Sequence, residues 1–97
     1  MIDILRQQYL HRINIELPAL AKKTRLPVRF NHCFARIILD NLFEDCWYNH
    51  LSRQKPAYQQ LTETQLKQAI YIADQMLENP LTVTQLNNNS LGWRGHR

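Results

Sequence analysis

The sequence predicts a single all-α domain, residues 1–97, built around one central buried helix. Helix-forming Leu, Ile, Ala, Gln and Lys are abundant and there are only two glycines. Apolar residues recur at helical spacing in several segments, whereas no segment alternates apolar and polar residues as a strand does. A length of 97 residues also fits one domain with one core. We expect four main helices, at residues 2–17, 30–51, 62–79 and 83–91.

The first expected helix is followed by a basic connector at 22–29. The apolar residues of this helix recur at spacings of three and four, as in an amphipathic helix. They are Ile2, Leu5, Tyr9, Ile13 and Leu17. Pro18 either ends this helix or lies in the first turn of a short second one at 19–23. The connector loses the helical periodicity and carries four cations and no acid. After it, Asn31 is expected to cap the next helix.

The central helix, at 30–51, is expected to form the centre of the core because it is apolar on several sides. One side carries Phe30, Phe34, Ile37 and Ile38, and the other carries Leu39, Leu42, Phe43 and Cys46. A single polar line interrupts it, within a sector of roughly 80° on the helical wheel. This line consists of His32, Arg36, Asp40, Trp47 and His50. Asn41 lies on the first apolar side, so it would need hydrogen-bond partners if buried, from Tyr48 or a loop carbonyl.

The helix at 62–79 begins with the clearest local signal in the chain. Thr62 and Gln65 are spaced as a capping box, in which each side chain bonds the other residue's backbone N–H. Leu61 and Leu66 lie at the two positions of a hydrophobic staple, which would fix the direction in which the chain enters the helix. A helix start at this point is therefore predicted.

The same helix is expected to end at Asn79, because Pro80 disfavours the helical conformation at the residue before it. The motif LTETQL at 61–66 then recurs as LTVTQL at 81–86. We interpret this as a second helix start of the same kind. The last helix would then be short, from 83 to 91, and a basic tail would follow at 92–97.

The net charge of +4 is unevenly distributed, because cations concentrate in the connectors at 22–29 and 52–60 and in the tail, while acids lie on the helices. In one interpretation these loops are simply solvated, and the modest size of the charge favours this view. In the other, the cations converge into one surface that binds phosphate, above all nucleic acid. The residues of this candidate surface are Lys22, Lys23, Arg25, Arg29, Arg53, Lys55, Arg94 and Arg97.

The polar line of the central helix is a second candidate site, formed by His32, Arg36, Asp40 and Trp47. Successive residues of the first three would lie about 6 Å apart along a helix, so they cannot all converge on one atom. A structural ion pair between Arg36 and Asp40 is the favoured interpretation, because such networks imitate functional ones. The functional alternative is an anion or nucleotide held by Arg36, with His32 and Trp47 beside it.

Several kinds of chemistry are excluded by geometry. On one helix, His32 and His50 would lie roughly 27 Å apart, so no metal site is expected unless His11 or His96 folds in. Cys33 and Cys46 would point in different directions, which disfavours a disulfide. Cys33 would also point away from His32, which removes a base-activated nucleophile. Both glycines lie in the tail, so there is no glycine-rich phosphate loop, and no cofactor is expected.

The expected location is the cytoplasm. No stretch approaches the roughly 18 consecutive apolar residues of a membrane span. Asp3 and Arg6 interrupt the N-terminus where the apolar core of a signal peptide would lie. Two cysteines that are not placed for a disulfide agree with a reducing compartment.

Three stretches together resemble a group of small uncharacterised bacterial proteins, some of which carry a GNAT-like acetyltransferase label. They are NHCFARIILDN at 31–41, PAYQQLT at 56–62 and LNNNSLGWRG at 86–95. The resemblance spans most of the chain and assigns no role to an individual residue. The acetyltransferase label would imply a mixed sheet and a glycine-containing pyrophosphate loop, whereas the patterns above predict neither.

The sequence thus favours a small, non-enzymatic binding module whose partner is nucleic acid or another polyanion. A protein partner that docks on the exposed helix faces is the alternative. A small-molecule or nucleotide-binding enzyme that uses the polar line is the third possibility. The joint at 79–81 also resembles the turn of a helix-turn-helix motif, whose second helix would expose Gln85, Asn87 and Asn88 to base edges.

Overall fold

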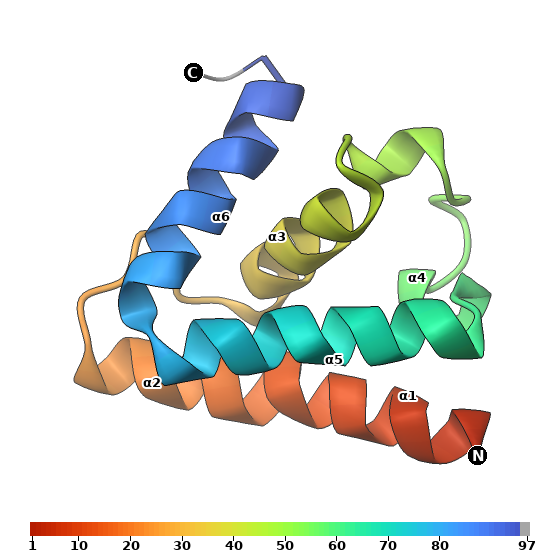
Figure 1. The fold of residues 1–97 in the computed structure, drawn as a ribbon, viewed down its shortest axis with the longest axis horizontal. Helices are drawn as coiled ribbons and strands as arrows, with labels where there is room; N and C mark the ends of the chain where they lie inside the picture. Colours follow the sequence, from red (N-terminus) through yellow and green to blue (C-terminus); the bar gives the residue numbers. More distant parts are fainter. Residues whose placement is uncertain (96–97) are drawn as a thin grey trace.

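The computed structural model describes residues 1–95, which form the all-α fold that the sequence predicts (Figure 1). No strand occurs within this range. In chain order, the elements are α1 (Ile2–His11), the π-helix η1 (Arg12–Glu16), α2 (Leu17–Lys23), α3 (Asn31–Phe43), the 3₁₀ turn η2 (Trp47–Asn49), α4 (Ala57–Gln60), α5 (Glu63–Glu78) and α6 (Pro80–Trp93).

The first three elements follow one another without a break and form one N-terminal rod, residues 2–23. Its buried residues are Leu5, Tyr9, Ile13 and Leu17. A spacing of four would rotate them away from the core in a helix of about 3.6 residues per turn. The π turn offsets this rotation, because the Leu17 N–H donates to the Arg12 carbonyl five residues back. Pro18 lies in the first turn of α2, the second of the two predicted placements.

The start of α3 differs from the prediction. Phe30 takes the capping position without a side-chain hydrogen bond, and Asn31 is the first helical residue. The Asn31 amide instead donates to the Asn14 side-chain oxygen at 2.9 Å, and its own oxygen accepts the His32 N–H at 2.8 Å. Phe30 was expected in the core but is 59% exposed. The capping prediction for Asn31 is therefore wrong.

The end of α3 differs more strongly, because the helix stops at Phe43 and not at residue 51. Glu44 takes the left-handed conformation (φ 53°, ψ 41°) and turns the chain away. The Asp45 carboxylate then accepts the Cys46 N–H at 2.8 Å and the Asn49 amide at 3.2 Å. Such local side-chain bonds compete with helical hydrogen bonds.

The early end of α3 overturns the helical-wheel positions of every residue beyond Phe43. Trp47 begins the separate turn η2, and His50 lies just after it. The His50 ring stacks on Phe43, with ring centroids 4.7 Å apart. The polar line therefore ends at Asp40. Trp47 lies near α3 because its backbone N–H donates to the Asp40 carboxylate at 2.9 Å.

The start of α5 confirms the predicted capping box. The Thr62 hydroxyl accepts the Gln65 N–H at 3.1 Å, and the Gln65 side chain accepts the Thr62 N–H at 2.9 Å. Leu61 and Leu66, the residues of the predicted staple, are 2% and 0% exposed. The helix ends at Glu78, as the proline two residues later predicts.

α6 begins earlier and ends later than the predicted 83–91. Pro80 is its first residue, and the Asn79 side chain accepts the Leu81 N–H at 3.1 Å as a cap. The stretch LTVTQL lies inside this helix, so its interpretation as a second helix start is wrong. The only residue between α5 and α6 is Asn79.

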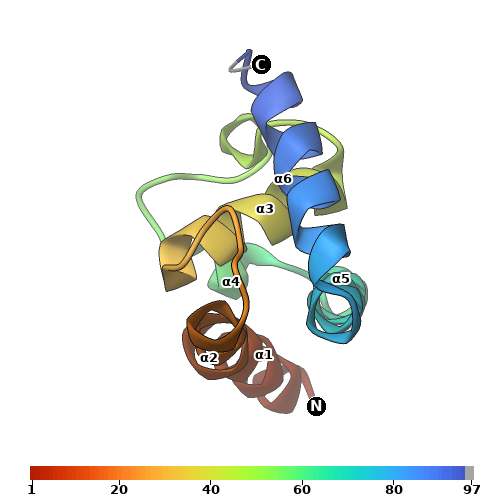
Figure 2. The ribbon, with the colours of Figure 1, turned by 90° about the vertical axis from the view of Figure 1, so that its left-hand side faces the viewer.

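Figures 1 and 2 show how the helices are arranged. The N-terminal rod and α5 lie side by side and run in the same direction, and α6 rises from the end of α5 (Figure 1). α3 contacts the rod, α5 and α6. Five of its thirteen residues are buried, including Phe34, Ile37 and Ile38 at 0% exposure. The prediction of a central helix is thus confirmed, although the helix is shorter than expected.

Candidate functional site

The segment around the first connector presents four exposed cations without acidic partners. Lys22 and Lys23 end α2, and Arg25 and Arg29 follow in the connector. Within residues 1–95, none of the four forms a salt bridge. Three other arginines are paired with acids: Arg6 with Asp3, Arg12 with Glu16 and Asp74, and Arg94 with Asp40. The connector therefore concentrates positive charge that no described acid neutralises at close range.

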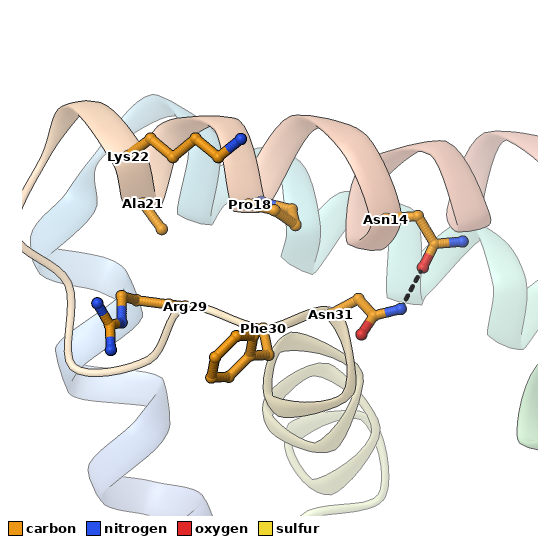
Figure 3. A pocket seen from close by; sticks show the side chains of 7 residues that line it. All are labelled: Asn14, Pro18, Ala21, Lys22, Arg29, Phe30 and Asn31. Carbon is orange, nitrogen blue, oxygen red and sulfur yellow. Dashed lines mark hydrogen bonds between the residues drawn. The ribbon is translucent and has the colours of Figure 1, made fainter.

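A pocket of about 660 Å³, here named the connector pocket, opens between the rod and the start of α3 (Figure 3). Its lining consists of Asn14, Pro18, Ala21, Lys22, Arg29, Phe30 and Asn31. In Figure 3, Lys22 extends along the rod, and Arg29 lies across the gap on the connector, with its guanidinium directed away from the Lys22 amino group. The hydrogen bond between Asn14 and Asn31 closes one end of the pocket. Cationic residues from two different segments thus line the same pocket.

Local backbone conformation explains why the connector holds this position. Thr24 ends α2 in an extended conformation (φ −135°, ψ 139°), while its N–H still donates to the Leu20 carbonyl at 2.9 Å. Phe30, at the other end, is also extended (φ −104°, ψ 152°). The chain can therefore leave the rod, cross the gap and enter α3 with Arg29 beside the entry.

A second pocket, of about 410 Å³, adjoins the first and is named the tip pocket. It shares Ala21, Lys22 and Arg29 with the connector pocket and adds Lys23 and Arg25 to the lining. All four cations of the connector region therefore line the tip pocket, and Lys22 and Arg29 line both pockets. Like charges so close together repel one another, and an anion bound among them would relieve that repulsion.

The other predicted cations do not join this group. The loop at 50–56 lies at the opposite end of the long axis from the first connector (Figure 1). Its Arg53 guanidinium sits over the Tyr48 ring, 4.0 Å from the ring centroid. Lys55 is exposed in the same loop. Arg97 lies outside the described residues. The eight predicted cations therefore do not form one surface in the described part of the chain.

Arg36 and Asp40 do not form the predicted ion pair. Arg36 donates to the Ser90 hydroxyl at 2.7 Å and to the Asn87 side-chain oxygen at 2.8 Å. Asp40, at 0% exposure, accepts from Arg94 at 2.6 and 3.1 Å and from Ser90 at 2.6 Å. Both residues of α3 thus find partners on α6, and Ser90 links them. The prediction of an intrahelical pair is wrong because α6 packs against that face of α3.

Arg94 is removed from the candidate basic surface by this arrangement. Its side chain is 14% exposed, and its hydrogen bonds to Asp40 raise the pKa of the guanidinium above its ordinary value. Asn87, which a helix-turn-helix reader would expose, is 8% exposed and bonded to Arg36. The α6 side chains at these positions hold the fold together.

Asn41 also joins α3 to α6. Its amide donates to the Ile37 carbonyl at 2.7 Å and to the Leu86 carbonyl at 3.0 Å. Its oxygen accepts from the Asn89 amide at 3.3 Å. The partners are thus helix carbonyls and an amide, and neither Tyr48 nor a loop carbonyl bonds it.

Three residues of the predicted polar line meet at a third pocket, of about 400 Å³, named the aromatic pocket. His32, Arg36 and Trp47 all line it, whereas Asp40 does not. The rest of its lining includes Tyr9, Tyr48, Lys55 and Tyr58. The pocket is rich in aromatic rings and carries cationic side chains at two places.

The structural role of the polar α6 side chains was missed from the sequence, which named Asn87 and Arg94 only as candidate binding residues and did not name Ser90. Asn87, Ser90 and Arg94 follow one another at spacings of three and four, so a polar stripe on the last helix was a detectable signal. Asn14 and Phe30, in contrast, line the connector pocket only because the π turn and the extended entry of α3 place them there. No local pattern marks them.

Comparison of the chain with protein-family models, with curated proteins and with solved structures finds no match. Among residues 1–95, no group of three or more His, Cys, Asp or Glu side chains is placed to hold a metal ion. None of the described helices has both the length and the apolar character needed to cross a membrane.

Proposed function

We propose that this protein is a binding module for nucleic acid or a related polyanion, and that the first connector is its binding surface. The observation that carries the proposal is the group of four exposed cations around two adjoining pockets, none of them paired with an acid among residues 1–95. They are Lys22, Lys23, Arg25 and Arg29. A cation already paired with an acid must give up that ion pair to bind a phosphate. Within the described residues, these four cations have no such ion pair to break.

The distribution of the cations favours a polymer over a single small anion. All four line the tip pocket, and Lys22 and Arg29 also line the adjoining connector pocket, so there is room among them for more than one phosphate. A nucleic acid offers a phosphate at every nucleotide, so neighbouring phosphates can occupy both pockets. Each phosphate that is bound releases a condensed counterion, which is the main source of affinity in such complexes.

The proposal is tested by fluorescence anisotropy with labelled mixed-sequence DNA, as single strand and duplex, and with tRNA. Affinity is expected to fall linearly with salt concentration on logarithmic axes. Measurements should extend down to about 10 mM salt, where the screening length reaches roughly 30 Å and phosphate contacts are strongest. Absence of binding to all three ligands at that salt concentration would refute the proposal. A neutral polymer of similar length is the control for non-electrostatic adsorption.

A further inference from the structure

The tip pocket lies at the end of α2 and the connector, the connector pocket lies between the rod and the start of α3, and the aromatic pocket lies where the rod, α3 and the segment 47–58 meet. Together they are here named the seam. The tip and connector pockets share lining residues, including Lys22 and Arg29. The connector and aromatic pockets are joined by two stacked rings: Phe30 lines the first, His32 lines the second, and their planes are 4° from parallel at 5.8 Å. The seam therefore offers binding positions on both sides of these stacked rings.

Cations and accessible rings alternate along the seam. Lys22 and Arg29 lie at the connector pocket, the Phe30 and His32 rings follow, and Arg36 and Lys55 lie at the aromatic pocket. Phe30 is 59% exposed although it is a large apolar side chain. The ring already stacks with His32, and the Arg29 guanidinium carbon lies over it, 5.9 Å from the ring centroid. A planar ligand would extend this stack or take the place of one of these two partners.

The Arg36 side chain is held in place by hydrogen bonds to α6. Its two terminal nitrogens donate to Ser90 at 2.7 Å and to Asn87 at 2.8 Å, and both of these partners are buried. Because no carboxylate bonds the guanidinium directly, its charge is not neutralised by a partner within the described residues. It can therefore attract an anionic ligand into the aromatic pocket.

We infer that the ligand of the seam is single-stranded nucleic acid, with phosphates on the cations and unpaired bases on the Phe30 and His32 rings and in the aromatic pocket. This inference rests on the proposed function. Alternating cations and aromatic rings are the means by which single strands are bound without sequence preference, because every base has a face that can stack. The bases of a duplex are stacked on each other and cannot enter the pockets.

The test compares oligonucleotides of about 15 residues, a length that covers typical single-strand sites. Oligo-dT and oligo-U serve as single strands, and a mixed-sequence strand is measured alone and as its duplex at the same salt. We expect both homopolymers to bind, and the mixed strand to bind at least tenfold more tightly than its duplex. Oligo-dU is measured as well, because it differs from oligo-U only in the 2′-hydroxyl, and a preference between these two identifies DNA or RNA as the favoured ligand.

Two variants of exposed residues test the stacking. Phe30→Leu and His32→Leu remove a ring, and each should weaken single-strand binding about fivefold or more, since base stacking on a ring contributes about 1 to 3 kcal/mol. Tyr71→Leu is the matched control, because Tyr71 is 64% exposed on α5 and lines none of the three seam pockets. Circular dichroism verifies that each variant is folded.

The outcomes separate the inference from the proposal on which it rests. Equal or tighter binding of the duplex, or undiminished binding by both ring variants, overturns the inference while leaving polyanion binding intact. Failure of every nucleic acid to bind at low salt overturns both. If Phe30→Leu and His32→Leu lose single-strand affinity while Tyr71→Leu keeps it, the result supports base stacking on these two rings.

Discussion

The carboxylate of Asp40 and the guanidinium of Arg94 form an ion pair that joins the last turn of α3 to the end of α6. The Arg94 Nε lies 2.6 Å from the Asp40 Oδ2, and Nη2 lies 3.1 Å from Oδ1. Asp40 also accepts the Trp47 N–H at 2.9 Å, which ties the turn after α3 to the same carboxylate. One buried side chain therefore holds together α3, the turn that follows it and the end of α6, which is distant in the sequence.

Replacing Asp40 with Ala should lower the free energy of unfolding by about 3 to 5 kcal/mol, because it leaves the partly buried Arg94 without its counter-charge. Asp3→Ala is the matched control, since Asp3 pairs with Arg6 at 3.4 Å but its side chain is 84% exposed. Exposed pairs contribute only about 0 to 1 kcal/mol. Urea denaturation measures both variants. Equal losses of unfolding free energy in the two variants would show that the buried Asp40–Arg94 pair stabilises the fold no more than an exposed pair does.

Arg36→Met should cost about 1 to 3 kcal/mol, because it leaves the buried Asn87 and Ser90 acceptors without a donor. Ser90 also donates to Asp40, so Arg36 and Asp40 are connected through one hydroxyl. A double-mutant cycle of Arg36→Met with Ser90→Ala should show a coupling energy of at least about 0.5 kcal/mol. Strict additivity of the two losses would contradict the network.

Ile37→Ala should cost about 2 to 5 kcal/mol, because Ile37 is 0% exposed in the centre of the core and its truncation opens a cavity. Ile15→Ala provides the same chemical change at a position that is 57% exposed, and a loss below about 1 kcal/mol is expected there. Thermal or urea denaturation distinguishes them. Similar losses at both positions would mean that α3 is not the centre of the core.

Burial raises the pKa of Tyr9 well above its ordinary value. Below the unfolded pKa of about 10, Tyr9 is neutral in both states and its contribution to stability is complete. Above that pH the unfolded chain loses the proton first, so stability falls by up to about 1.4 kcal/mol per pH unit until the folded group also ionises. Tyr9→Phe should therefore lose less stability than the wild type between about pH 10 and 11. Parallel pH profiles would contradict this assignment.

Much of the fold was predictable because its signals are local. The capping box of Thr62 and Gln65 and the stop before Pro80 depend on neighbouring residues, and both are found as predicted. The end of α3 was missed because the apolar pattern continues past Phe43. There the conformation of Glu44 and the bonds of Asp45 interrupt the helix without a glycine or proline to mark the site.

Less of the candidate sites was predictable, because their partners come from distant segments. The four cations of the first connector stand close to one another in sequence, and their composition alone identified them. The partners of Arg36 and Asp40 could not be found in the same way. Two oppositely charged residues four apart suggest a pair within one helix, whereas α6 packs across that face and supplies better-placed groups.

The measurement that tests the central claim most directly is the salt dependence of nucleic-acid binding by a variant with all four connector cations replaced by Gln. The changed residues are Lys22, Lys23, Arg25 and Arg29. Lys67→Gln, an exposed α5 residue that lines none of the three seam pockets, is the control for removal of charge elsewhere. The fourfold variant should stay folded and bind more weakly, with a salt slope reduced by roughly 0.7 to 0.9 for each phosphate that it no longer neutralises. An unchanged slope and affinity in the folded fourfold variant would contradict the claim.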